Sequence, residues 1–127
     1  MNTYDYAHAL AKAIKSSPEY KAYKESHEQL EKDSSAKEMI SDFRKNQWEL
    51  QQQKMSGIEV PPEKEERFSK ALEIMSLNMI VKKYLEAEYR FSIMLTDIQK
   101  IISSPLEEII SQEMVDQLQK NKEQQKE

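Results

Sequence analysis

The chain contains one glycine and four prolines in 127 residues, and this scarcity constrains its fold more than any other feature. Both residues are unfavourable inside helices, and together they supply many of the tight turns that strand-rich proteins need. Neither residue occurs from Glu63 to Ile102. The sequence therefore predicts an all-α fold, a small bundle of about five to six helices built on a long antiparallel helical hairpin.

Serine–proline pairs predict where two helices begin. Ser17 before Pro18, and Ser104 before Pro105, each combine a side chain that can cap free N–H groups with a proline at the first helical position. A further boundary is expected at residues 76–78. The expected helices are residues 4–15, 18–32, 36–55, 63–75, 78–102 and 106–118.

The helix of residues 36–55 has a predicted start and end. Ser35 and Glu38 have the S-x-x-E spacing of a capping box, and Gly57 is suited to the left-handed residue that follows many helices. Apolar residues recur along this helix with a heptad rhythm. Because residues 80–102 carry the most apolar face of the chain over a similar length, we expect these two helices to pair along their lengths.

Length and composition favour one folded domain. A chain of this size can bury a core without disulfides or metals, and apolar spacing continues to Leu118. The residues after it, NKEQQKE among them, have nothing to bury. We expect residues 1–118 to form a single helical-bundle domain and residues 119–127 to be a polar, frayed or disordered tail.

The sequence lacks the common sites of catalysis and cofactor binding. With no cysteine and one glycine, it cannot form thiolate metal sites or glycine-rich phosphate loops. His8 and His27 are isolated, although His27 and Glu31 lie one helical turn apart. Glu88 lies at the edge of an apolar face, where it is expected to pair with an Arg or Lys of a neighbouring helix. We predict no catalytic residue, no metal and no cofactor.

Five apolar residues fall outside the main apolar faces. They are Trp48 and Met55 on the helix of residues 36–55, and Val81, Leu85 and Tyr89 on the helix that follows residue 78. A second apolar face is either covered within the monomer or closed by a second copy or another protein. Trp and Tyr are favoured in interfaces, so these five residues are the predicted partner or dimer interface.

Three stretches of the sequence resemble the bacterial YlbF/YmcA family, and within it the uncharacterised YheA-type members. They are Ser17-Pro18-Glu19-Tyr20, the helix from Phe43 to Gly57, and Tyr84-Leu85-Glu86-Ala87-Glu88, within a match spanning residues 4–106. The resemblance implies a self-associating helical bundle that acts as a regulatory subunit, in complexes linked to RNA processing and development. Cysteine-held clusters of some relatives do not transfer to this chain.

These observations lead to one main functional hypothesis. We expect a non-enzymatic, cytoplasmic interaction protein, self-associating as a homodimer and binding another regulatory protein. An acidic net charge of -4 argues against direct nucleic-acid binding. The sequence has no run of 18 apolar residues, so no membrane span is predicted. The alternatives are a holdase-like structural bundle and a metal-dependent enzyme using Glu88 and His27.

Overall fold

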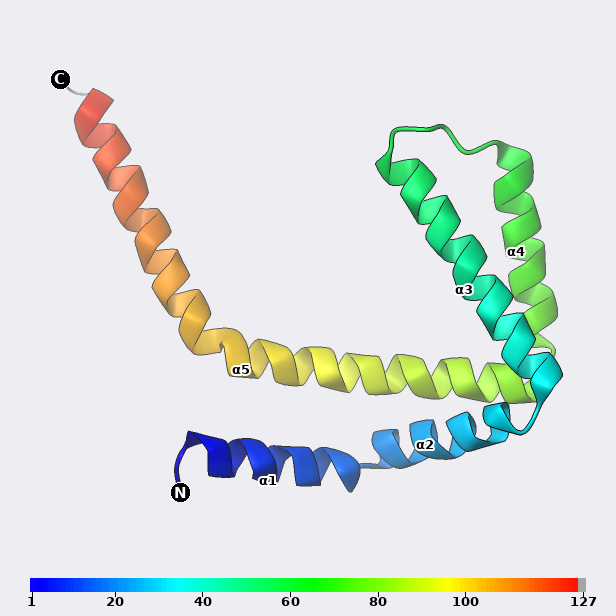
Figure 1. Cartoon of the computed structure of the whole chain (residues 1–127). Coiled ribbons are helices and arrows are strands. Elements are labelled where there is room, and N and C mark those ends of the chain that lie inside the picture. The colour runs from blue at the N-terminus through cyan, green and yellow to red at the C-terminus, as the bar shows by residue number, and fades with distance from the viewer. Residues whose placement is uncertain (126–127) are drawn as a thin grey trace. The chain divides into compact units, whose positions relative to one another are not determined.

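The computed structural model describes residues 1–125 and folds them into helices, with no strand in that range. The helices are α1 (Thr3–Lys15), α2 (Pro18–Glu31), α3 (Ser34–Met55), α4 (Pro62–Ser76) and α5 (Met79–Gln125), as Figure 1 shows. This confirms the all-α prediction. The chain divides into two compact units, Met1–Phe91 and Ser92–Glu127, which are described separately.

Side-chain caps begin α1, α2, α3 and α5. Asn2 and Asp5 form a reciprocal capping box at the start of α1. The Ser17 hydroxyl accepts a hydrogen bond from the backbone N–H of Tyr20 at 3.1 Å, and α2 starts at Pro18 as predicted. At the start of α5, Asn78 caps the N–H groups of the second and third following residues. The predicted boundary at residues 76–78 is therefore confirmed.

The ends of α3 follow the sequence prediction at one terminus only. The predicted cap by Ser35 is wrong, because Asp33 accepts the hydrogen bond from the Ala36 N–H at 3.0 Å and the helix begins at Ser34. At the other end Gly57 has a φ of 75°, and the two backbone hydrogen bonds of a Schellman motif close the helix. Only a residue tolerant of positive φ fits there.

The helical hairpin of the first unit consists of α3 and α4. Figure 1 shows these two helices side by side, joined by the extended segment before Pro62. The rings of Phe43 and Phe68 stack at 5.1 Å, and Lys64 donates to Gln53 near the loop that connects the two helices. The expected lengthwise pairing of α3 with residues 80–102 is therefore wrong. α4 takes that place because its own apolar stripe faces α3.

The core of the first unit lies where α2, α3, α4 and α5 meet. Its buried cluster draws on all four helices and comprises Leu30, Ala36, Ile40, Met75, Val81 and Tyr84. Tyr23, Met39, Phe43, Ile80 and Leu85 pack against this cluster and are partly buried. In residues 1–125, every buried side-chain nitrogen or oxygen has a hydrogen-bond partner. The core thus fixes the α2, α3 and α5 faces that hold the polar residues described below.

The predicted helix start after Ser104 is wrong, because α5 continues through Pro105 to Gln125. Pro105 has no N–H to donate to the carbonyl of Ile101, but the Ser104 hydroxyl donates to that carbonyl at 2.8 Å. The carbonyl is therefore satisfied and the helix bends without ending, as Figure 1 shows between its yellow and orange parts.

The helix also includes part of the expected tail. Residues 119–125 are helical, and residues 126 and 127 lie outside the described range. The division into a domain of residues 1–118 and a tail of residues 119–127 stays a prediction. No helix in the described part of the chain combines the length and apolar character that a bilayer-crossing segment needs.

Candidate functional site

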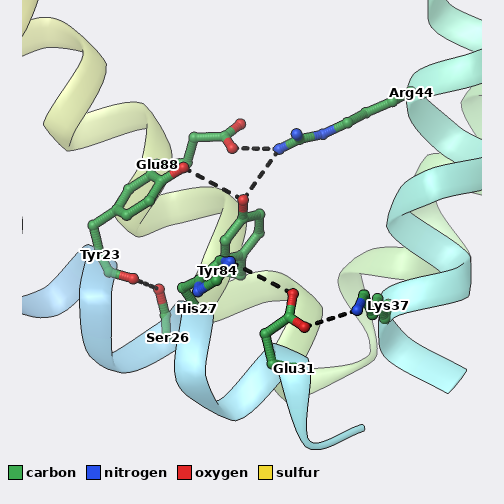
Figure 2. Close-up of polar contacts among 8 residues, drawn as sticks. All are labelled: Tyr23, Ser26, His27, Glu31, Lys37, Arg44, Tyr84 and Glu88. Carbon is green, nitrogen blue, oxygen red and sulfur yellow. Dashed lines mark hydrogen bonds and ion pairs between the residues drawn. The ribbon is translucent and has the colours of Figure 1, made fainter. Parts of the chain in front are cut away.

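A polar cluster joins three helices at the edge of the core, and Tyr84 of α5 lies at its centre (Figure 2). The Tyr84 hydroxyl lies 3.4 Å from the Tyr23 hydroxyl of α2, and the Arg44 guanidinium of α3 donates to it at 3.4 Å. Arg44 also lies over the Tyr84 ring, 5.7 Å from its centroid. One side chain of α2 and one of α3 therefore contact the same buried phenol of α5.

Arg44 of α3 and Glu88 of α5 form an ion pair beside this phenol. The structure thus confirms that Glu88 pairs with a basic residue of a neighbouring helix. Burial works to lower the pKa of the Arg44 guanidinium, but the charge of Glu88 and the hydrogen bond to it outweigh burial and raise that pKa. Arg44 stays charged, and its guanidinium is already paired with Glu88. The ion pair therefore links α3 to α5.

A second ion pair links the end of α2 to the start of α3. Glu31 accepts a hydrogen bond from Lys37 at 2.7 Å and lies 3.5 Å from His27, one helical turn earlier. The Lys37 hydrogen bond lowers the pKa of the Glu31 carboxyl, and the nearby charges of Lys37 and His27 add to this effect. All three side chains are substantially exposed, so the contribution of these contacts to stability is small.

The phenol of Tyr84 leads to a prediction about alkaline stability. Burial, followed by the hydrogen bond with Tyr23 and the charge of Glu88, raises the pKa of Tyr84 from 10.0 to about 12. The folded unit prefers the neutral phenol, so this stabilisation is complete below pH 10.0 and is lost as pH rises through about 12. We expect Tyr84→Phe to flatten the fall in unfolding free energy across that window, measured by urea denaturation.

The matched control for this prediction is Tyr4→Phe, which removes an exposed tyrosine hydroxyl from α1. It should leave the alkaline slope as it is in the parent protein. Equal slopes for the parent protein and Tyr84→Phe would show that ionisation of Tyr84 does not limit alkaline stability.

The polar contacts of the cluster hold α2, α3 and α5 together and engage its ionisable groups with one another. Tyr84 remains protonated at neutral pH, and the carboxylate of Glu88 is already paired with Arg44. His27 contacts Glu31 and the Tyr84 ring and does not meet Glu88 in any recorded contact. Within residues 1–125, no three His, Asp or Glu residues lie together as a metal site. The geometry therefore gives no support to the metal-dependent alternative.

A shallow groove of about 420 Å³ separates α2 from the first turns of α5. Small and apolar side chains form part of its lining, and charges of both signs form the rest: Ala22, Glu25, Ser26, Gln29, Met79, Ile80, Lys83, Glu86, Ala87 and Arg90. Because the two bases are matched by two acids, the groove offers no net charge that would select an anion or a cation.

The structure separates the five predicted interface residues into two groups. Trp48, Met55 and Tyr89 are 62%, 76% and 67% exposed, whereas Val81 is fully buried and Leu85 packs against the core. Val81 therefore does not lie on an accessible surface, and for this residue the face is covered within the monomer. No recorded contact brings Trp48 and Tyr89 together.

Two of the exposed members are close in sequence to the Arg44–Glu88 ion pair, whereas Met55 lies at the end of α3. Trp48 follows Arg44 by one helical turn on α3, and Tyr89 follows Glu88 directly on α5. The sequence prediction missed Arg44 and the hydroxyl contact between Tyr23 and Tyr84. Arg44 lies beside the α3 apolar stripe just as Glu88 lies beside that of α5, and this shared edge position is the signal that could have paired them.

Comparisons with known proteins identify relatives across most of the chain. The family model described as "Control of competence regulator ComK, YlbF/YmcA" matches residues 3–107. A UPF0342 protein of Alkalihalophilus pseudofirmus is 44% identical over 108 residues, covering 85% of this chain and 92% of the relative. A UPF0342 protein of Halothermothrix orenii is 40% identical over 107 residues, covering 84% of this chain and 91% of the relative.

A solved structure is also similar to this chain. It is titled a protein of unknown function (DUF964) from Bacillus stearothermophilus, and it superimposes with a TM-score of 0.69 at 28% sequence identity. The match covers 83% of this chain and 92% of the solved one. The resemblance seen in the sequence is therefore confirmed, and so is the helical fold.

Proposed function

Because the chain belongs to the YlbF/YmcA family, we propose that it is a non-enzymatic cytoplasmic interaction protein that binds another regulatory protein and associates with itself. The family description refers to control of a competence regulator, which is a regulatory process. This description supports a protein partner over a small-molecule substrate. A link to RNA processing or development extends the same family resemblance.

The observation that carries the proposal is the exposure of Trp48, Met55 and Tyr89. Large aromatic side chains cost free energy when they stay in water, and they are favoured at the centres of protein interfaces. The Arg44–Glu88 ion pair fixes α3 to α5 one helical turn before Trp48 and one residue before Tyr89, so both residues are held on a preorganised support. We name these three exposed residues the Trp48 surface.

Partner capture tests the Trp48 surface. We expect the parent protein, immobilised and exposed to lysate of its native host, to retain a defined partner, and Trp48→Ala or Tyr89→Ala to lose most of it. Hot-spot truncations cost about 2 kcal/mol or more, which corresponds to roughly 30-fold weaker binding. Bound proteins are identified and quantified by mass spectrometry, and the captured partner is then purified and titrated against each variant.

Tyr4→Ala is the matched control, because Tyr4 is an exposed tyrosine on α1, away from this surface. It should capture the partner as the parent protein does. Equal capture and an equal oligomeric state in all four proteins would remove the Trp48 surface from the proposal. Capture of many unfolded proteins in place of one defined partner would favour the holdase-like alternative.

A further inference from the structure

The second unit presents a row of large apolar side chains with no recorded cover. Five of them recur at every fourth residue of α5, and each is 45–63% exposed: Ile102, Leu106, Ile110, Met114 and Leu118. We call these five residues the α5 row. Successive positions are displaced by about 40° around the helix, so they form one continuous ridge. No charged residue interrupts that ridge.

The α5 row has no packing partner within its own unit. Residues 92–125 form only helix α5, and no second element of that unit lies against it. Isolated helices are marginal in water, and most of their stability in proteins comes from burial of an apolar face. Five exposed large apolar residues on one ridge are therefore a surface that needs a cover.

We infer that the α5 row is the self-association surface, paired antiparallel with the same row of a second copy. This inference rests on the proposed self-association, but it assigns that contact to α5 and leaves the Trp48 surface available for another protein. Rows with four-residue spacing pack into one another in the commonest class of helix contact. A second copy supplies an identical row, as an isologous two-fold contact requires.

The area of the row is sufficient for such a contact. Full burial of one Leu, Ile or Met side chain removes roughly 60–120 Å² of apolar surface from water. With the two-fold axis near Met114, residues 106–122 of the two copies lie opposite each other, so Leu106, Ile110, Met114 and Leu118 of each copy can enter the contact. These eight side chains would remove about 480–960 Å² before the polar flanks are counted. Specific interfaces bury about 1,000 Å² or more in total. The α5 row therefore approaches this size without any other surface.

The charges of α5 favour the antiparallel arrangement. Residues 107–116 include four acidic residues, Glu107, Glu108, Glu113 and Asp116, and no basic one, whereas Lys120 and Lys122 follow. A parallel pair would place the two acidic segments opposite each other. With the two-fold axis near Met114, an antiparallel pair places the start of each acidic segment beside the two lysines of the other copy.

The proposed contact lies mainly beyond the part of the chain that the family model matches. That match ends at residue 107, and three members of the α5 row follow that residue. The contact would cover the apolar ridge that α5 carries past Pro105.

The first test measures the mass in solution of the full chain by light scattering. The parent protein should have twice the 15.0 kDa mass of one chain. Ile110→Glu should weaken the association by at least about 100-fold, because both copies lose a central contact. Ile101→Glu is the matched control, since Ile101 is exposed and lies about 180° around the helix from Ile110. A monomeric parent protein, or a dimer unaffected by Ile110→Glu, would overturn the inference.

The second test uses the absence of cysteine to determine the orientation. Disulfides form only where two Cα atoms come within about 7 Å. Under mild oxidation Met114→Cys should therefore cross-link with itself, whereas Leu118→Cys should cross-link only when mixed with Ile110→Cys. In the antiparallel pair the two copies of residue 118 lie about 12 Å apart along the axis. Ready self-cross-linking of Leu118→Cys would show a parallel pair and overturn the antiparallel assignment.

The same variants separate this inference from the proposed function. If Ile110→Glu is monomeric and still captures the partner, both proposals stand. If Ile110→Glu remains dimeric while Trp48→Ala or Tyr89→Ala becomes monomeric, the α5 assignment is wrong and self-association belongs to the Trp48 surface. Loss of capture only in Ile110→Glu would place partner binding on the dimer and contradict the role of the Trp48 surface.

Discussion

Val81→Asp is expected to unfold the Met1–Phe91 unit. Val81 is fully buried in the core cluster, in contact with residues from the neighbouring helices. A carboxylate placed there has no basic partner within the cluster and must either lose its hydration or take up a proton. Either route costs at least about 3–5 kcal/mol, a large part of the roughly 5–15 kcal/mol that stabilises a typical domain. Circular dichroism during urea denaturation measures the loss.

The matched control is Tyr89→Asp, which places the same carboxylate two helical turns later at an exposed position of α5. Its unfolding free energy should stay within about 0.5 kcal/mol of the parent value. This comparison separates the two members of the predicted interface, since Val81 is buried in the core and Tyr89 lies at the surface. Similar losses in both variants would contradict the burial of Val81.

Local chemistry was sufficient to predict most helix ends from the sequence. Asn2, Ser17 and Asn78 act through side-chain oxygens that reach N–H groups two or three residues later, and Gly57 acts through its own backbone conformation. Such interactions depend on a few neighbouring residues, so they can be recognised from the sequence alone. The edge position of Glu88 was also predictable, because it follows from helical spacing alone.

The errors came from competition between features that look alike in sequence. Ser17-Pro18 and Ser104-Pro105 are the same pair, yet the first starts a helix and the second lies inside one. In both pairs the serine hydroxyl donates to the carbonyl three residues before it. Ser17, however, is extended, with a ψ of 150°, and α2 begins after it, whereas α5 stays helical through Ser104 and Pro105. At α3, Asp33 caps the Ala36 N–H and the helix begins at Ser34, so Ser35 lies inside the first turn and not at the cap.

Helix pairing and burial depend on contacts far apart in the chain, and these could not be predicted. The apolar stripe of α3 fits α4 or α5 equally well by period, and the Phe43–Phe68 stack shows that α4 is its partner. Val81 and Tyr89 both lie off the main stripe of α5, but only Val81 faces the junction of four helices. Sequence spacing gives the position of a side chain around its own helix. It does not say which neighbouring helix packs against that position.

The core at that junction should respond strongly to loss of volume as well as to charge. Ile40→Ala is expected to cost about 2–5 kcal/mol, because Ile40 is buried between α2, α3 and α4 and the removed methyl groups leave a cavity. Ile74→Ala is the control: it makes the same change at an exposed position of α4 and should cost less than about 1 kcal/mol. Urea denaturation of both variants at equal protein concentration measures the difference.

Since Ile40 lies within the first unit, light scattering should show Ile40→Ala still self-associated through α5 at low urea, where the helices remain folded. Equal stability of the two isoleucine variants would mean that the junction of α2, α3 and α4 does not hold the unit together, and the support for the Trp48 surface would then have to come from the Arg44–Glu88 pair alone.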